Sequence, residues 1–576
     1  MKLFKKILQS AIVTGSVLIG ATSCVSDLDT MPLDDNSLVN AQVYSSRDGY
    51  LGVLAKCYAS LILTGQKGGD GGDRDLQNFD EGYSGYVRIL FYLQEQTSDN
   101  MLMHSTSRGL RQCLNLTYDA SNCEVLTGCY QRLYMAGAYC NEFLRASTES
   151  SIKGYGVWEQ MSRDYLTMRA EARLIRAYTY LMLCDLYGNV PVIDENVGVK
   201  ELPVQRTRKE VWQFVEAELK SVIGEGISDE VLAEPGMNVY ARVDKAAAWM
   251  ILARLYLNAQ EWIGENHYQE AYEYSRKVID CGKYPLASDW RHIFLADNNT
   301  CKEIVWPLVQ DGAKAQSSAG TNFYVKAFVN GAMESLYKTG VGTKGWGNAR
   351  CKTTFVDAFD DNDVHFDIND PWGNNKNDKR AQFMDALDGQ TKATWTGNDE
   401  WSSKFTHGYS CIKWRNVTKD NQDAPSGSVY TSIDFPLLRS AEAYLTAAEA
   451  ILRGASGSRQ EALNYINEVR CRAYMSDNYA CPGIKSSVSG KITDSDLTLD
   501  FLLDELQREF ATECHRRTDL VRFGKYTSGK NWDWKGTACH GQDVSQHLKV
   551  FPIPASEMVT NPNLKQNEGY ASTTAH

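Results

Sequence analysis

Apolar residues recur at helical spacing along most of this chain. The segment EARLIRAYTYLMLCDLYGNVPV (171–192) has one apolar stripe, which predicts a helix that ends before Gly188 and Pro191. The segments 243–262 and 268–280 have the same periodicity. The stripes consist of Leu174, Ala177, Tyr178, Leu181 and Cys184 in the first segment, Val243, Ala246, Ala247, Met250, Ala253 and Leu257 in the second, and Tyr268, Ala271, Tyr272, Ser275 and Val278 in the third.

Consecutive helical segments are joined by short turns, which predicts helix pairs. The segment 243–262 is followed closely by 268–280, and 440–454 by 458–473. Alanines at the crossing points let two helices approach closely, and such Ala- and Tyr-rich pairs are typical of tetratricopeptide-like hairpins. The pairs are degenerate and not contiguous. The pattern therefore predicts a mostly α-helical scaffold that is interrupted by large insertions.

Two stretches lack sustained helical stripes. Residues 65–86 and about 284–435 are rich in Gly, Asn, Asp and aromatic residues, with short strand-like runs such as EIVWPLV (303–309). They are interpreted as loops and short hairpins packed on the helices. The helical scaffold then covers about 24–283 and 436–576, with a loop-rich insertion at about 284–435. Binding residues concentrate on loops held by a rigid scaffold, so the insertion is expected to carry a ligand face.

The first 23 residues have the pattern of an export signal. Three lysines precede an apolar run, Ile7–Gly20, that is shorter than the roughly 20 residues needed to span a bilayer. Small residues then lead into Cys24, and ATSC resembles a bacterial lipobox, in which the cysteine is lipidated. Residues 1–23 are therefore predicted to be a lipoprotein signal peptide. The alternative is an ordinary cleaved signal followed by a chance cysteine.

Charge and cysteine spacing exclude several classes of protein. The net charge of −12 becomes −15 without the three lysines of the signal, which argues against nucleic-acid binding. The 15 cysteines are irregularly spaced, without a C-x-x-C motif. Most are interpreted as small buried hydrophobes, and no zinc or other metal site and no cofactor is predicted.

Three motifs have a plain structural interpretation. GVGTKG (340–345) matches a dinucleotide-binding pattern, but no apolar strand precedes it and no helical pattern follows. The acidic run DDNDVHFDINDP (360–371) lacks the glycine and terminal Glu of a hand-type calcium loop. Glu509, Glu513 and His515 could form an acid/base cluster, but Arg508, Arg516 and Arg517 nearby favour structural ion pairs.

Six sequence blocks resemble the SusD/RagB family of outer-membrane glycan-binding lipoproteins. In chain order they are CVSDLDTMPLD, AEARLIRAYTYLMLCDLYGNVPV, DKAAAWMILARLYLNA, DFPLLRSAEAYLTAAEA, REFATECHRRTDLVRFG and FPIPASEMVTNPNLKQNEGY. The loop TGQKGGDGGDRDLQNFDEGYSGYVR (64–88) and DWKG (533–536) further resemble the starch-binding founder of the family.

The resemblance implies a fold, a partner and a location. The fold would contain four tetratricopeptide-like units and an insertion region with the ligand face. The partner would be a SusC-like TonB-dependent transporter, a barrel in the outer membrane, which the lipid-anchored protein covers at the cell surface. A structural calcium ion is known in some relatives. The ligand would be a polysaccharide or oligosaccharide, with an α-glucan suggested by the founder.

The resemblance also implies ligand-binding residues, because sugar rings stack on aromatic side chains and sugar hydroxyls need hydrogen-bond partners. Position by position, it assigns glycan contacts to Trp346, Phe323, Tyr324 and Arg88. His104 stands where the founder has a tryptophan and is a further candidate contact, although it and Ser107 depart from the founder's pattern. Each residue also has a structural interpretation: the aromatic rings as core residues, Arg88 as an ion-pair partner and His104 as a surface residue. Alternative platforms in the insertion are Trp372, Trp395 and Trp401.

Three functions are therefore compared. The expected one is a surface glycan-binding protein, without catalytic activity, that delivers its ligand to the transporter. The first alternative is a secreted glycoside hydrolase, which needs two carboxyl groups flanking the scissile bond. The second is a tetratricopeptide-type adaptor that binds a protein partner.

Overall fold

The computed structural model describes residues 40–66, 68–69, 73–77, 79–103, 105, 107–198, 201–334, 336–342, 345–385, 409–425, 427, 429–474, 490–527 and 543–571. The chain divides into two compact units. The smaller contains residues 1–52 and 146–163, and the larger contains residues 53–145 and 164–576.

The smaller unit is built on a cluster of tyrosines. It contains α2 (Asn40–Val43), the first part of α3 (Arg47–Ala59), α7 (Glu149–Gly154) and α8 (Trp158–Met161). The ring of Tyr44 lies 4.9 Å from that of Tyr50 and 5.7 Å from that of Tyr155, measured between centroids. The backbone N–H of Arg47 donates to the side-chain oxygen of Gln160 at 3.2 Å, which ties α3 to α8.

The larger unit consists mainly of helices. Its helices are α4 (Tyr86–Phe91), α5 (Leu110–Asn115), α6 (Glu124–Ala146), α9 (Tyr165–Leu186), α10 (Arg208–Lys220), α11 (Lys245–Leu257), α12 (Ala259–Ile263), α13 (Tyr268–Asp280), α14 (Thr321–Lys326), α15 (Gly331–Glu334), α16 (Thr353–Val356), α17 (Ser440–Leu452), α18 (Arg459–Tyr474), α19 (Leu499–Phe510), α20 (Arg516–Arg522) and α21 (Ala555–Thr560). A single π-helical turn, Tyr92–Gln96, continues α4.

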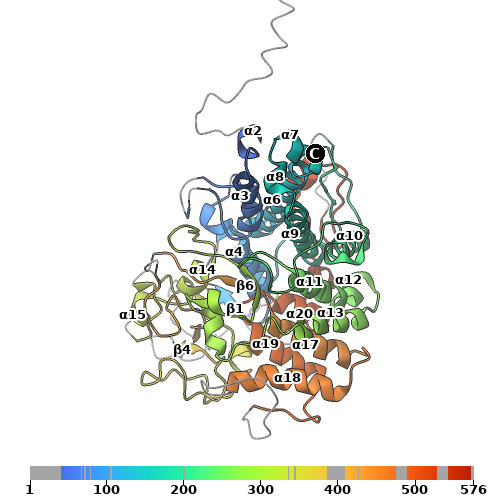
Figure 1. Cartoon of the computed structure of the whole chain (residues 1–576). Coiled ribbons are helices and arrows are strands. Elements are labelled where there is room, and N and C mark those ends of the chain that lie inside the picture. Colours follow the sequence, from blue (N-terminus) through green and yellow to red (C-terminus); the bar gives the residue numbers. More distant parts are fainter. Residues whose placement is uncertain are drawn as a thin grey trace, which may run out of the picture. The chain divides into compact units, whose positions relative to one another are not determined.

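Both predicted helix pairs are confirmed, because α11 packs on α13 and α17 packs on α18. Helix α9 also packs on α10, and α13 contacts α17, so that the pairs form a continuous stack (Figure 1). The alanines of α11 are buried at these contacts, as the close approach of two helices requires. Helix α9 ends before Gly188, whose φ of +70° terminates the helix where the sequence predicts it.

The strands are short and pair two by two. They are β1 (Met101–Met103), β2 (Ile304–Leu308), β3 (Ala349–Cys351), β4 (Phe383–Asp385), β5 (Tyr409–Cys411) and β6 (Phe435–Arg439). The antiparallel pairs are β1–β3, β2–β6 and β4–β5. Strand β2 confirms the strand predicted at 303–309. It pairs Ile304 with Arg439 and Leu308 with Phe435, and so brings the two ends of the loop-rich segment together.

A network of buried ion pairs joins this loop-rich segment to the helices. Glu509 of α19 binds Arg439 at 2.6 Å, Arg380 at 3.0 Å and also Arg472 of α18. Arg439, at the end of β6, also binds Glu513 at 2.6 Å. Each of these side chains is at most 1 % exposed. The network therefore links β6, the segment before β4, and helices α18 and α19 in the protein interior.

The positive charges determine the protonation state of the network. Burial alone would raise the pKa of Glu509, but the charges of Arg472, Arg439 and Arg380 lower it to about 2. Burial likewise raises the pKa of Glu505, but the charges of Arg380 and Arg470 outweigh it and hold this pKa well below its usual range. Both carboxylates are therefore ionised at neutral pH and balanced by arginine charges.

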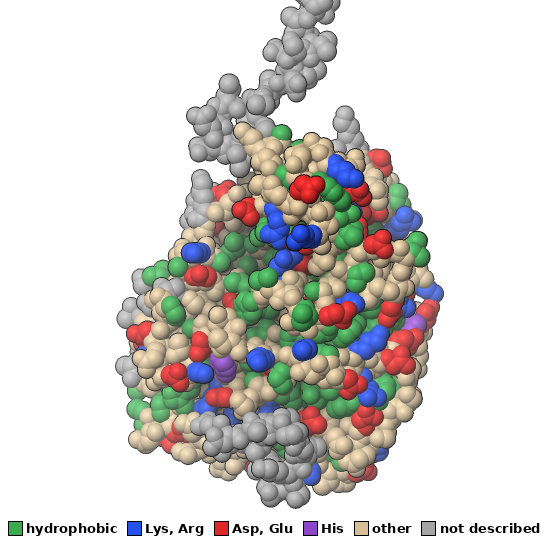
Figure 2. Space-filling view, in the orientation of Figure 1, with side chains coloured by type: hydrophobic (Ala, Val, Ile, Leu, Met, Phe, Trp, Pro, Cys, Tyr) green, Lys and Arg blue, Asp and Glu red, His purple; other side chains and the backbone are tan. Residues whose placement is uncertain are grey.

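Acidic and basic side chains are interspersed on the face that Figure 2 shows, without a continuous basic stripe across it. This distribution agrees with the net charge of −12. Among the described helices, none has both the length and the hydropathy needed to cross a bilayer.

We predict that Glu509→Gln lowers the free energy of unfolding by about 3–5 kcal/mol, because it leaves buried arginines without their counter-charge. The matched control is Asp280→Asn, which removes the exposed Arg276–Asp280 pair of α13. This control should change the free energy of unfolding by less than about 0.5 kcal/mol. Urea-induced unfolding monitored by circular dichroism measures both. If both variants lower the free energy of unfolding by the same small amount, the buried network contributes little to stability.

We predict that the combined contribution of Glu509 and Glu95 to thermal stability is highest at about pH 5. The folded-state pKa of Glu509 lies below its ordinary value of 4.5, so its contribution is complete above pH 4.5 and is lost as the pH falls toward 2. Burial raises the pKa of Glu95 to about 7, so its contribution grows as the pH falls from 7 toward 4.5. Melting temperatures from acid to alkaline pH test this. Glu95→Gln should flatten the neutral side of the profile, and an unaltered profile would contradict the assignment.

Candidate functional site

The loop that carries Trp346 is held close to the backbone of the segment after α14. The backbone N–H of Trp346 donates to the carbonyl of Lys326 at 2.6 Å. A side chain at Gly345 would place its Cβ only 2.3 Å from the carbonyl oxygen of Val329, so this close approach requires glycine. The Trp346 side chain remains 40 % exposed. The glycines thus allow the loop to present the indole ring, as the sequence indicates.

Arg88 of α4 lies beneath this ring. Its guanidinium carbon is 5.2 Å from the ring centroid of Trp346, 4.8 Å from that of Phe323 and 4.0 Å from that of Tyr83. These are cation–π distances, which are worth about 0.5–2 kcal/mol according to the degree of desolvation. The four side chains form one aromatic–guanidinium stack, hereafter the Tyr83–Trp346 stack.

Hydrogen bonds fix the orientation of Arg88. Its Nε donates to the hydroxyl of Tyr92 at 2.8 Å, and one terminal nitrogen donates to the carbonyl of Gly82 at 2.6 Å. Among the described residues, the side-chain hydrogen-bond partners of Arg88 are Tyr92 and Gly82, so the ion-pair interpretation gains no support there. Arg88 is itself only 6 % exposed, so its main role in the described structure is to support the aromatic rings, and little of its surface is open to a ligand hydroxyl.

Phe323 and Tyr324 correct the predicted site. Both side chains are fully buried, so neither ring reaches a ligand. The Tyr324 hydroxyl donates to the carbonyl of Val87 at 3.0 Å, and its ring packs 5.1 Å from Trp414, measured between centroids. Phe323 instead supports the stack from below, with its centroid 6.3 Å from that of Trp346. For Tyr324 the structure favours the core interpretation, and for Phe323 a supporting role.

Tyr83 is the functional candidate that sequence reasoning missed. It closes a short 3₁₀ turn, Glu81–Tyr83, directly before α4, and its side chain is partly exposed. Its ring also lies 5.8 Å from the guanidinium carbon of Arg108, which in turn binds Glu124 at 2.6 Å. The sequence signal that could have identified Tyr83 as a binding residue was its position five residues before Arg88 in a Gly-rich, acidic loop.

The other predicted positions are not part of the stack as described. His104, Trp395 and Trp401 lie outside the described residues, and so does Cys24. Ser107 is exposed. Trp372 is partly buried and its ring is covered by Arg415, whose guanidinium carbon is 3.8 Å from the ring centroid. A covered ring offers less surface to a sugar than Trp346 does.

The acid cluster around residue 509 forms structural ion pairs, as the sequence favours, but with other partners than those predicted. Glu509 binds Arg380, Arg439 and Arg472 rather than the three arginines near it in the sequence. Those three have separate partners: Arg508 pairs with Glu505, Arg516 with Asp99, and Arg517 donates to the carbonyls of Leu548 and Lys549.

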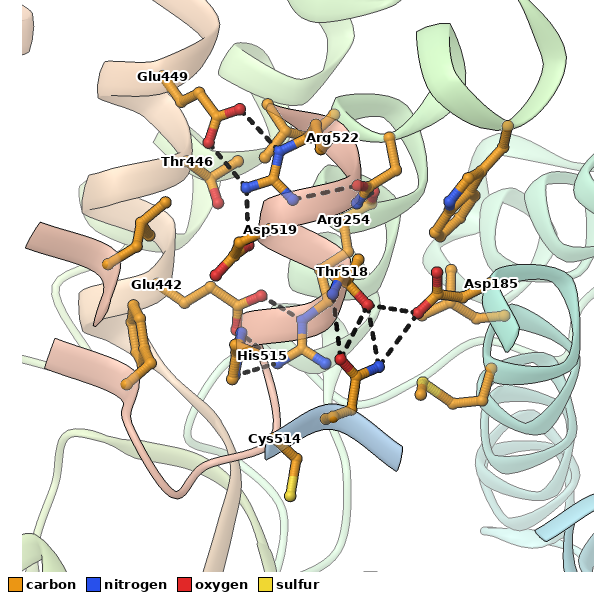
Figure 3. A pocket seen from close by; sticks show the side chains of 18 residues that line it. Asp185, Arg254, Glu442, Thr446, Glu449, Cys514, His515, Thr518, Asp519 and Arg522 are labelled. Atoms are coloured by element: carbon orange, nitrogen blue, oxygen red, sulfur yellow. Dashed lines mark hydrogen bonds and ion pairs between the residues drawn. The ribbon is translucent and has the colours of Figure 1, made fainter. Parts of the chain in front are cut away.

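His515 lies in a separate small pocket (Figure 3). Its neighbours there are Arg254, which binds Glu442, and Arg522, which lies between Glu449 and Asp519. Burial and the charges of Arg254, Arg439 and Arg522 lower the pKa of His515 well below its usual range. The pocket volume is about 60 Å³, whereas ligand pockets usually measure about 300–1,000 Å³. Neither acid cluster therefore has the form of a glycosidase site.

The acidic run 360–371 is used for local turns. Both carboxylate oxygens of Asp363 accept backbone N–H groups, from Asn377 and Asp378, each at 2.9 Å. A carboxylate of Asp370 accepts the N–H of Asn375 at 2.6 Å. Within the described ranges, no group of three or more His, Cys, Asp or Glu side chains is arranged to hold a metal ion.

Comparisons with known proteins agree with this architecture. A profile described as "SusD family" matches residues 302–570, and one described as "Starch-binding associating with outer membrane" matches residues 80–257. The starch-binding protein SusD of Bacteroides thetaiotaomicron is 33 % identical over 98 % of this chain and 99 % of its own. The chain belongs to the SusD family.

Solved structures similar to this SusD family member show the same fold. A SusD-like protein of Bacteroides fragilis has a TM-score of 0.65 at 19 % identity, covering 94 % of this chain and 100 % of its own. Surface glycan-binding protein A of Bacteroides thetaiotaomicron, solved with laminarihexaose, has a TM-score of 0.63 at 18 % identity. The match covers 91 % of this chain and 99 % of that protein's chain. The recognition of the family from six sequence blocks is therefore confirmed.

We predict that Trp346→Ala and Tyr324→Ala differ sharply in stability. Removing the exposed indole ring should lower the free energy of unfolding by about 1 kcal/mol or less, the scale of a cation–π contact at an exposed site. Removing the buried Tyr324 ring should cost about 3–5 kcal/mol, as for other large core aromatics. Denaturant titration of the two variants measures the difference, and a large loss for Trp346→Ala would identify it as a core residue.

Proposed function

We propose that this SusD family member captures a polysaccharide or oligosaccharide at the cell surface and delivers it to a TonB-dependent transporter of the outer membrane. The ligand is an α-glucan of the starch type. The observation that carries the proposal is the Tyr83–Trp346 stack, in which an exposed indole ring lies above a guanidinium group that is held by two protein hydrogen bonds.

The stack suits the chemistry of a neutral sugar. The exposed face of Trp346 offers a platform for the C–H face of a pyranose ring, while Arg88, which is only 6 % exposed, mainly holds the rings in place. Buried Phe323 keeps the platform in place before the ligand arrives. Such preorganisation reduces the entropy that is lost on binding.

The choice of an α-glucan is supported by the name of the 33 % identical relative, a starch-binding protein. The laminarihexaose complex of a more distant relative makes a β-glucan the natural comparison ligand. We infer binding without turnover, because the acids and the histidine that could imitate a catalytic cluster are held in buried ion pairs or lie in a pocket too small for a sugar.

We predict that Trp346→Ala weakens binding roughly 10- to 100-fold, taking about 1–3 kcal/mol per stacked ring as the scale. Tyr83→Ala should weaken binding as well, whereas Trp158→Ala, which removes a partly exposed tryptophan of α8, should not. Affinity gel electrophoresis with starch, laminarin, xylan, mannan and fructan measures retardation, and melting curves control for folding.

Two outcomes would contradict this proposal. Unchanged retardation of Trp346→Ala would move the binding site to Trp372, Trp395 or Trp401. New reducing ends that accompany the purified protein and disappear in Glu509→Gln or Glu513→Gln, in a variant whose melting curve shows that it is folded, would favour a hydrolase.

We predict that Cys24→Ala releases the protein from washed membranes without changing its melting curve, because Cys24 is the proposed site of lipid attachment. A tagged wild-type protein should co-purify with a transporter barrel from detergent-solubilised outer membranes, and so should Trp346→Ala. Membrane retention of Cys24→Ala would contradict the anchor. Co-purification with the barrel in the absence of any glycan affinity would favour the adaptor.

A further inference from the structure

Six buried cysteines lie in three pairs. The Sγ atoms of Cys113 and Cys123 are 3.3 Å apart. The thiol of Cys140 and burial raise the pKa of Cys57, and burial and the thiol of Cys411 raise the pKa of Cys351, so these side chains also interact in pairs. All six side chains are buried. The sequence-based interpretation as small hydrophobes explains isolated cysteines such as Cys129 and Cys184, but it does not explain why six of the twelve described cysteines face one another.

Contacts of neighbouring residues support each pairing. Beside Cys57 and Cys140, the ammonium of Lys56 lies 5.1 Å from the ring centroid of Tyr139, so α3 and α6 are in contact here. Cys351 ends β3 and Cys411 ends β5, and these two strands contact each other. For the pair at 113, the Cys123 sulfur also lies 3.6 Å from the carbonyl oxygen of Gly109.

A metal does not explain the pairs. A structural zinc site needs four ligands, and each pair supplies two. The described residues contain no group of three or more His, Cys, Asp or Glu side chains that could complete such a site. Two thiols in contact within an exported protein are instead the arrangement from which a disulfide forms.

We propose that the exported protein carries three disulfides, Cys57–Cys140, Cys113–Cys123 and Cys351–Cys411. In each pair the two S–H bonds break and one S–S bond forms, and two electrons and two protons pass to the disulfide of a thiol–disulfide oxidoreductase, which becomes a dithiol. The hydrogen bond to Cys123 and burial raise the pKa of Cys113 well above its usual range. Since thiolates are the reactive form, exchange takes place before the pairs are fully buried.

Two of the bridges flank the Tyr83–Trp346 stack. Cys351 lies five residues after Trp346, in the strand that follows its loop. Cys113 and Cys123 enclose the turn between α5 and α6, and Arg108, just before α5, contacts the Tyr83 ring. The disulfides would therefore fasten the chain on both sides of the glycan platform. A disulfide also stabilises the fold by restricting the unfolded chain.

Peptide mapping of the protein exported by its native route tests the proposal. The protein is denatured in the presence of an alkylating agent and without a reductant, digested and analysed by mass spectrometry. We expect three cross-linked peptides with the stated partners, each of which separates after reduction with a gain of two hydrogen atoms. Recovery of the six cysteines in alkylated form, or linked to other partners, would overturn the assignment, and a single unlinked pair would overturn that bridge.

Single variants provide the matched control. Cys351→Ala should expose one further alkylatable thiol, that of Cys411, and leave the other two cross-linked peptides unchanged. Cys184→Ala, which removes a buried cysteine without a cysteine partner among the described residues, should change none of the three. If Cys411 becomes cross-linked to a different cysteine in Cys351→Ala, the pairing of Cys351 with Cys411 is not specific and this bridge is contradicted. The inference rests on export and not on glycan binding, so its failure is distinguishable from failure of the proposed function.

Discussion

The ion pairs of Arg439 and Glu509 are the constraint on which the arrangement of this protein depends. They join β6 to α19 and, through Arg380 and Arg472, to the segment before β4 and to α18. Charges taken out of water lose several kcal/mol of hydration free energy each, which is recovered only when all partners are in place together. An incompletely assembled interior is therefore strongly disfavoured. The loops of the insertion and the helices of the scaffold must fold as one cooperative structure.

The helical part of the fold could be predicted from the sequence because its information is local. The apolar stripes of 243–262 and 268–280 are set by spacing within a few turns, and α11 and α13 form there and bury those residues. The run at 303–309 gave strand β2 for the same reason. The partners of Glu509 could not be predicted in this way. Arg380, Arg439 and Arg472 are distant in sequence, whereas the local arginines that the sequence suggested serve other groups.

The functional site shows the same limit at the scale of single side chains. Trp346 could be identified because glycines surround an aromatic residue in a polar loop, a pattern that favours exposure. Neighbouring Phe323 and Tyr324 have no such signal, since the side that each ring faces is decided by how the short helix α14 packs, and both are buried. Tyr83 was missed because its importance comes from the position of Arg88, which only the folded chain shows.

The pairing of β2 with β6 has an evolutionary consequence. Because Ile304 lies beside Arg439 and Leu308 beside Phe435, the chain leaves the helical stack and returns to it at nearly one point. The entropy of closing such an excursion grows only slowly with its length. Insertions and deletions in the intervening loops can therefore accumulate without moving the helices, provided that Arg380 and the other buried ion-pair partners are kept. New ligand preferences can arise on one inherited scaffold, which agrees with relatives that keep the fold at 18–19 % identity.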